Sequence, residues 1–195
     1  SDNPPITAAA ESVNCIAVHP SVPAGNLGEL IEYSRRNPGR LSYGSAGVGS
    51  VFHMIGELFT RATGTVMVHV PYKGNAPATA DLVAGQVPVI FTAVSSALPH
   101  LRSGKVKILA VLEPARYAPL PGVPSINETL PAFEKPASWF GFFGPPRLAR
   151  PVLSRRNTEI VRALHEPDTR AKFDEAALAE LKAKGVKLID EIPRL

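Results

Sequence analysis

The chain has 195 residues, 45% of them hydrophobic, and a formal charge of +4. This length suits one large or two small domains with buried cores, and no apolar run reaches the roughly eighteen residues that a membrane span needs. The basic residues are spread along the chain rather than interleaved with aromatic residues, which argues against nucleic acid as a partner.

The cysteine content and the first residues of the chain bear on disulfides, metal sites and export signals. Cys15 is the single cysteine, so the sequence predicts no internal disulfide and no thiolate cage for a metal. The opening residues, SDNPPITAAAES, lack the basic and then apolar pattern of a secretory signal. We therefore expect that any export signal was removed from this sequence or was never part of it.

Residues 41–91 begin with a strand, a glycine-bearing loop and a capped helix. The strand is predicted over 41–43 and the loop over 44–49. Ser50 is the predicted N-cap of the helix, and Gly64 ends it. One face of this helix would carry the apolar side chains of Val51, Ile55, Leu58, Phe59 and Ala62.

A second unit follows the same plan. It has a strand over 66–70, a loop over 71–76, and a helix with Pro77 at its first position and Gly85 just beyond its end. A further strand over 87–91 follows. This alternation of strands and helices predicts an α/β fold with an open, parallel-dominated sheet.

Both loops lie where an anion can bind. The first N–H groups of a helix have no partner within the helix, so together with the loop amides they can hold a carboxylate or a phosphate. Thr92 follows the strand over 87–91 at its carboxyl end, where open α/β sheets bind ligands. Pro88 lacks a backbone donor, so we expect this strand to be irregular or to lie toward an edge.

Several motifs in one order carry a resemblance to a known family. They are GxLxYGSAGxGSxxHxxGELF, VHVPYKGxAPAxxDLxxGQV, SALPHxxSGKVxxLAV and LPGVPSxxE, and the similarity runs from about His19 through Pro146. The chain resembles the Bug family of periplasmic solute-binding proteins, the receptors of tripartite tricarboxylate transporters. The resemblance implies a periplasmic-binding-protein fold whose two α/β domains close on a small organic acid, such as a dicarboxylate, without changing it chemically. It also implies a periplasmic location and delivery of the acid to membrane permease subunits, or in some relatives to a sensor kinase.

The same resemblance implies an N-terminally incomplete first domain. Residues 1–20 would hold the strand that crosses from it, residues 21–136 would form a Rossmann-like second domain, and residues 137–195 would return to the first domain. The crossing strand is expected over 14–19 and the first helix of the second domain over 23–36. The return strand is expected over 138–144, with helices over 152–164 and 168–184.

An amphipathic helix without its sheet exposes an apolar stripe. We therefore expect the stripe of the first returning helix to pack against the second domain or a second copy of the chain, as a homo-oligomer or by domain exchange. Its residues are Val152, Leu153, Ile160, Val161 and Leu164.

The ligand-binding residues that the resemblance implies lie in the two loops and at the strand that follows them. They are Ser45, Ala46, Gly47, Ser50, Tyr72, Lys73, Gly74, Ala76 and Thr92. A tight turn would also explain the glycines, capping alone would explain Ser50, and a solvated lysine would explain Lys73. His53 lies in the first helical turn, where it would orient the loop. Relatives commonly carry an acidic residue where this chain has Thr92, which favours a ligand without an amino group.

Enzymatic functions find little support. The first loop lacks the spacing of G-x-S-x-G and of G-x-G-x-x-G, and the chain has no G-x-x-x-x-G-K-[ST] and no H-E-x-x-H. We therefore predict no catalytic residue, no metal and no cofactor. Two other functions stay open: a ligand-sensing module of similar fold, and a fragment that no longer binds solute and only assembles.

Overall fold

The computed structural model describes residues 3–169. Its contacts divide the chain into two compact units, one formed by Val13–Pro136 and one by the two ends of the chain. The sequence suggested a boundary near residue 20; the division falls before Val13 because residues Asn14–Val18 form a strand in the sheet of the larger unit. No helix in residues 3–169 is long and apolar enough to cross a membrane.

The larger unit is built on a five-stranded sheet with the order β4-β3-β5-β2-β6. β3 pairs in parallel with both β4 and β5, whereas β2 runs antiparallel to β5 and β6. The sheet is therefore mixed, and its parallel part is the half that carries the two predicted loops. The strands are β2 (Asn14–Val18), β3 (Ser42–Ser45), β4 (Val68–Pro71), β5 (Val89–Ala93) and β6 (Lys107–Val111).

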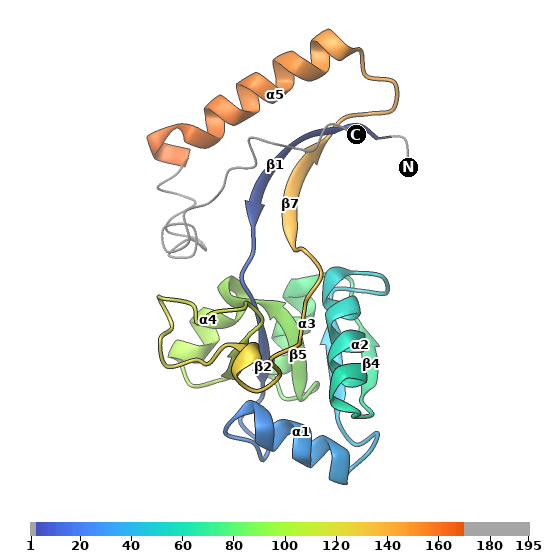
Figure 1. Ribbon diagram of the computed structural model, residues 1–195, viewed down its shortest axis with the longest axis vertical. Coiled ribbons are helices and arrows are strands. Elements are labelled where there is room, and N and C mark those ends of the chain that lie inside the picture. Colours follow the sequence, from blue (N-terminus) through green and yellow to red (C-terminus); the bar gives the residue numbers. More distant parts are fainter. Residues whose placement is uncertain (1–2, 170–195) are drawn as a thin grey trace. The chain divides into compact units, whose positions relative to one another are not determined.

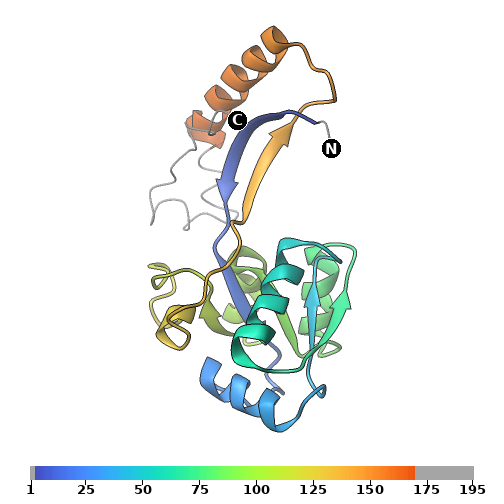
Figure 2. The same ribbon diagram turned by 45° about the vertical axis from the view of Figure 1, so that its right-hand side comes forward.

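Helices cover both faces of this sheet. One apolar cluster joins the sheet to α1 and α2 and includes Leu30, Ile55 and Phe59, while a second joins it to α3 and α4 and includes Leu82 and Ala97. Figure 2 shows α2 as the teal helix over the parallel strands. The helices are α1 (Leu27–Arg36), α2 (Val51–Thr63), α3 (Asn75–Val83) and α4 (Val94–Arg102), with a 3-10 turn η1 (Ile126–Glu128).

Helix α2 confirms the predicted caps but corrects the predicted face. Ser50 caps it by accepting a hydrogen bond from the His53 N–H, and Gly64 ends it in the left-handed conformation. Ile55 and Phe59 are buried as predicted, whereas Leu58 is 38% exposed and Ala62 is exposed. The buried stripe instead includes Phe52, Gly56 and Thr63.

The prediction for the strand around Pro88 was wrong. β5 begins at Val89, so Pro88 precedes the paired residues, and its carbonyl accepts a hydrogen bond from the His19 N–H at 2.9 Å. The strand is buried along its whole length and lies between β3 and β2 rather than at an edge. Helix α3 begins at Asn75, which puts Pro77 in its first turn but not at its first position.

Within residues 3–169, the smaller unit consists of a two-stranded antiparallel sheet with one helix along it (Figure 1). β1 (Pro5–Glu11) pairs with β7 (Trp139–Phe143), and α5 (Arg150–His165) lies against β1, where the Asn157 amide donates to the carbonyl of Ile6 at 2.6 Å.

The stripe of α5 is only partly covered in this unit. Leu153, Ile160, Val161 and Leu164 are half-buried, and Val152 is 41% exposed. A second copy of the chain as its partner stays a prediction. The helix expected over 168–184 lies almost wholly outside the described residues.

Candidate functional site

The two predicted loops lie side by side at the carboxyl ends of β3 and β4. Because these strands are parallel neighbours, the loops that follow them leave the sheet at the same edge. Two hydrogen bonds continue the pairing beyond the strands, from the Tyr72 N–H to the carbonyl of Ser45 at 3.1 Å and from the Gly74 N–H to the carbonyl of Ala46 at 3.2 Å. The structure therefore joins two segments that the sequence separates by more than twenty residues.

Most polar groups of the first loop are used within the protein. Ser45 is buried, its Oγ lies 2.7 Å from His69 Nε2, and it accepts a hydrogen bond from the Gly47 N–H at 3.2 Å. The Gly49 N–H donates to His53 Nδ1 at 3.1 Å. Among the described residues, the amides of Ala46 and Val48 have no hydrogen-bond partner. These two amides are thus the donors that the first loop has left for a ligand.

In the second loop the tyrosine side chain bonds to the protein itself, whereas the lysine side chain is exposed. The Tyr72 hydroxyl donates to Asp81 Oδ2 at 2.9 Å. Burial and, second, this hydrogen bond raise the pKa of Tyr72 to about 12. Its ring packs on the backbone of Gly44, where a Cβ would lie 3.1 Å from Cε2. Lys73 is exposed and pairs with no carboxylate of residues 3–169.

Helix α3 starts without a side-chain cap. Its N-cap is Gly74, at a φ of 118°, and no side chain accepts a hydrogen bond from its first amides. The amides of Lys73, Asn75 and Ala76 have no partner in the described part of the chain. By contrast, Ser50 caps α2 and Asn26 caps α1. The start of α3 therefore keeps the unpaired donors, and the partial positive charge, that favour an anion.

Thr92 connects the end of β5 to α3. Its side chain is buried, and its hydroxyl donates to Asn75 Oδ1 at 2.7 Å, while Asn75 Nδ2 donates to Ser96 Oγ at 2.7 Å. The sequence singled out Thr92 as a candidate, but not Asn75 and Ser96, which the structure joins to it. The available signal was an asparagine directly after the glycine that opens the helix.

We expect Thr92→Val to lower the free energy of unfolding by about 1 kcal/mol. The change keeps the shape of the side chain but removes one hydrogen bond to the partly buried Asn75 amide. Urea unfolding of the two proteins measures the difference. Thr60→Val serves as the control, since the Thr60 hydroxyl donates to a carbonyl of its own helix, α2, at an exposed position. An equal loss in both variants would contradict the prediction.

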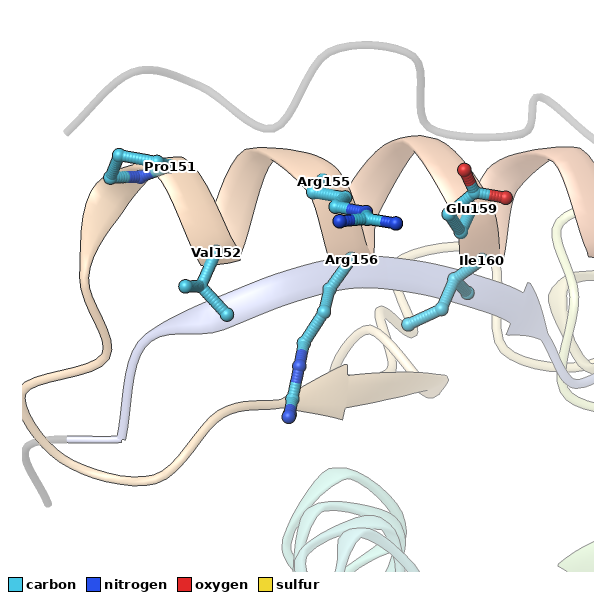
Figure 3. A pocket seen from close by; sticks show the side chains of 6 residues that line it. All are labelled: Pro151, Val152, Arg155, Arg156, Glu159 and Ile160. Atoms are coloured by element: carbon cyan, nitrogen blue, oxygen red, sulfur yellow. The ribbon is translucent and has the colours of Figure 1, made fainter.

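Residues 3–169 offer no metal centre, and the pocket on α5 holds none of the predicted site residues. No three histidine, cysteine, aspartate or glutamate side chains of residues 3–169 come together as metal ligands. Figure 3 shows a pocket whose described lining residues all belong to α5, namely Pro151, Val152, Arg155, Arg156, Glu159 and Ile160. The candidate site lies at the two loops because their unpaired amides can donate hydrogen bonds to an anion. The shape of a pocket by itself provides no such donors.

Comparison with known proteins identifies the family. A family model described as "Tripartite tricarboxylate transporter family receptor", TctC, matches residues 2–188. The chain belongs to the TctC receptor family. A relative from a Pseudomonas species, the UPF0065 protein in the tcbD-tcbE intergenic region, is 33% identical over 193 residues, and BugT of Bordetella pertussis is 29% identical over 161 residues. The predicted resemblance to the Bug family is therefore confirmed.

Solved structures agree with this TctC assignment. The R. palustris protein Rpa4515 with adipate superimposes with a TM-score of 0.83 at 32% identity, and MatC from Rhodopseudomonas palustris with bound malate with a TM-score of 0.84 at 29% identity. Each match covers 91% of this chain. The predicted periplasmic-binding-protein fold is thus confirmed, and membership of a receptor family agrees with the prediction that the chain is not an enzyme.

The TctC chain spans only part of its relatives' length. It matches 55% of the Pseudomonas relative and 49% of BugT, where the aligned region covers 98% and 82% of this chain. Of the two structures with adipate and malate it covers 59% and 60%. Relatives of the same fold are described as a periplasmic transporter and as the periplasmic binding protein BugD.

Proposed function

We propose that this chain binds a small organic carboxylate as an extracytoplasmic receptor of a tripartite tricarboxylate transporter. The observation that carries the proposal is the pair of adjoining loops with unpaired amides at Ala46, Val48, Lys73, Asn75 and Ala76. Backbone donors at a helix N-terminus suit a carboxylate. Adipate and malate in the related structures belong to the same ligand class.

The nine proposed ligand-binding residues fall into two roles. The amides of Ala46 and Ala76 and the ammonium of Lys73 would contact the carboxylate directly. Ser45, Gly47, Tyr72, Gly74 and Thr92 would shape the loops, because their polar groups already have partners inside the protein. Ser50 caps α2 and keeps its hydroxyl proton for a ligand.

Delivery and location follow from the same proposal. The loaded receptor would meet the membrane permease subunits in the periplasm, as its family description suggests. A sensor kinase as an alternative recipient, and a dimer formed by domain exchange, are further proposals that the receptor function does not require. The half-covered stripe of α5 supports the dimer.

Binding by this chain alone is expected to be weak. A hydrogen bond to a charged group contributes about 1.5 to 3 kcal/mol, whereas micromolar affinity needs about 8 kcal/mol net of the cost of association. Three or four amide contacts at an edge that water can reach therefore correspond to millimolar dissociation constants. A closed cleft would exclude water and strengthen each contact.

Calorimetric titration with adipate and malate at low salt tests the proposal. We expect saturable heat with at least one acid and none with the uncharged diamide of adipate, which has the same length. Lys73→Met should weaken the acid's binding and reduce its dependence on salt, whereas Lys105→Met, at a lysine just after α4 and outside the two loops, should not. Silence with both acids would contradict the proposal and favour a fragment that only assembles.

A further inference from the structure

Three aromatic rings stack beside the first loop. Tyr43 of β3 and His69 of β4 face each other across the parallel pair, with ring centroids 4.9 Å apart. His53, in the first turn of α2, stacks on His69 with centroids 4.0 Å apart and planes 12° apart. Two histidines in such close contact avoid mutual repulsion only while at least one of them is neutral.

Each histidine holds a different part of the loop. His53 Nδ1 accepts the Gly49 N–H. His69 Nε2 meets the Ser45 hydroxyl at 2.7 Å, and the same Ser45 oxygen accepts the Gly47 N–H. The rings therefore fix Gly49 directly and Gly47 through Ser45. Between these two fixed amides lies Val48, whose N–H has no partner among the described residues.

We propose that His53 and His69 are positioning residues: as a neutral stacked pair, they fix the Gly47 and Gly49 amides and thereby direct the Ala46 and Val48 amides toward a carboxylate. This inference rests on the proposed carboxylate-binding function. It assigns the histidines no contact with the ligand. The loop after β3 contains two glycines, Gly47 and Gly49, whose conformational freedom makes side-chain partners important for holding one conformation.

The proposal specifies where the protons are. His53 Nδ1 accepts a hydrogen bond, so the proton of the neutral ring is on Nε2, which lies 3.9 Å from Glu57 Oε1. Ser45 Oγ lies 2.7 Å from His69 Nε2, and the proposal assigns His69 the tautomer with its proton on Nδ1, so that Nε2 accepts from the Ser45 hydroxyl. In the opposite tautomer Nε2 would donate to Ser45 Oγ, and the hydroxyl would donate to the Gly47 carbonyl at 3.2 Å. Protonation of His53 would turn Nδ1 into a donor that faces the Gly49 N–H, and the hydrogen bond would be lost.

The charged and titratable groups that face His69 are His53 and Glu57 of α2 and Tyr43 of β3. Burial and, second, the charge of His53 lower the pKa of His69, while Glu57 raises it to a smaller extent. Tyr43 is itself held by Glu57, to which its hydroxyl donates at 2.6 Å, and burial with this contact keeps the pKa of Tyr43 above its usual value. The lowered pKa favours a neutral His69 near pH 7, and the hydrogen bond from the Gly49 N–H requires a His53 Nδ1 that carries no proton.

The sign of the pH effect follows from the lowered pKa. An unfolded histidine titrates near about pH 6.5, and the folded His69 takes up its proton only at a lower pH. The unfolded chain therefore binds the proton first, so this contribution to stability is complete above about pH 6.5 and is lost as the pH falls below it. The loop itself should lose order only at the lower pH at which the folded His69 takes up its proton.

Nuclear magnetic resonance of the whole chain tests the positioning role without any ligand. Long-range 1H–15N spectra should show the His53 proton on Nε2 at neutral pH. The amide protons of Gly47 and Gly49 should shift together with the titration of the two histidines. A proton on His53 Nδ1, or glycine amides that stay unchanged through the histidine titration, would overturn the proposal.

Adipate binding gives the second test. Asparagine places its Oδ1 near the position of Nδ1, and glutamine reaches the position of Nε2, so the double variant H53N and H69Q keeps both acceptors but does not titrate. From about pH 7.5 down to the acidic pH at which the spectra show His69 to be protonated, the affinity of the unchanged protein relative to this variant should fall about tenfold, as expected for loss of a loop hydrogen bond.

If protonated histidines acted only through their charge, the relative affinity for adipate would instead rise at low pH, because a positively charged imidazolium attracts an anion. A relative affinity that stays constant or rises at low pH would therefore contradict the positioning role. Protonation of adipate itself weakens binding to both proteins equally, so it cancels when the two affinities are compared at each pH. If neither protein binds adipate or malate at any pH, the proposed function fails, and the spectra of the Gly47 and Gly49 amides then decide whether the histidines position the loop.

Discussion

Gly56→Ala is expected to destabilise the larger unit by about 2 kcal/mol, although alanine favours a helix. In an open helix this change would add about 1 kcal/mol of stability. Here the new Cβ would lie 2.3 Å from Cε2 of Tyr43, inside the contact distance of two carbon atoms. The Tyr43 ring is fully buried, stacks on His69 and donates to Glu57, so it has no direction in which to move. Overpacking costs typically reach about 3 kcal/mol and outweigh the gain in helix propensity.

Urea unfolding followed by circular dichroism measures this loss, and a double-mutant cycle identifies its cause. In the background of Tyr43→Leu, whose shorter side chain leaves room beside α2, Gly56→Ala should raise stability by about 1 kcal/mol. The coupling between the two positions should then be about 3 kcal/mol. A loss of the same size in both backgrounds would show that contact with Tyr43 is not the reason.

The local features of the larger unit could be predicted from the sequence because they depend on neighbouring residues. Ser50 caps α2 through an amide three residues away, and Gly64 ends the helix through its own backbone conformation. The loops also lie at the starts of α2 and α3, where the glycines and Ser50 placed them. Each of these features needs only a short stretch of chain.

The contacts that organise the candidate site could not be predicted in the same way. Ser45 and His69 are 24 positions apart, and Asn75 and Thr92 are 17 apart. Which residues meet depends on strand order, and the order β4-β3-β5 is a property of the whole sheet. The sequence therefore predicted which two loops carry the candidate site, but not that Ser45 would contact His69 or that Thr92 would contact Asn75.

The buried face of α2 illustrates the same limit. Helical spacing correctly identified Ile55 and Phe59, yet Leu58 and Ala62 are exposed and Gly56 is buried. A glycine adds nothing to an apolar stripe, so a pattern of hydrophobic residues cannot place it. It lies on the buried face because the Tyr43 ring of β3 occupies the space that a side chain would need.

Gly47→Ala is expected to weaken carboxylate binding at least about tenfold, or by about 1.4 kcal/mol. Gly47 has a φ of 131°, a conformation that side chains rarely adopt, and a Cβ there would lie 3.1 Å from the carbonyl oxygen of Tyr72. Alanine would therefore strain the first loop and push it away from the second. Both effects turn the Ala46 and Val48 amides away from the positions that a shared carboxylate would require. Titration with adipate measures the change in affinity.

A control variant separates backbone strain from the loop contact. Gly39 also has a positive φ, of 72°, but a Cβ there has no atom within 4 Å, and the residue lies after α1, outside both loops. Gly39→Ala should cost stability of the order of 1 kcal/mol, as left-handed strain does, and leave adipate affinity unchanged. Equal adipate affinities of the unchanged protein, Gly47→Ala and Gly39→Ala would mean that the spacing of the two loops does not govern binding. A loss confined to Gly47→Ala would tie binding to the point at which the backbone of the first loop passes the carbonyl of Tyr72.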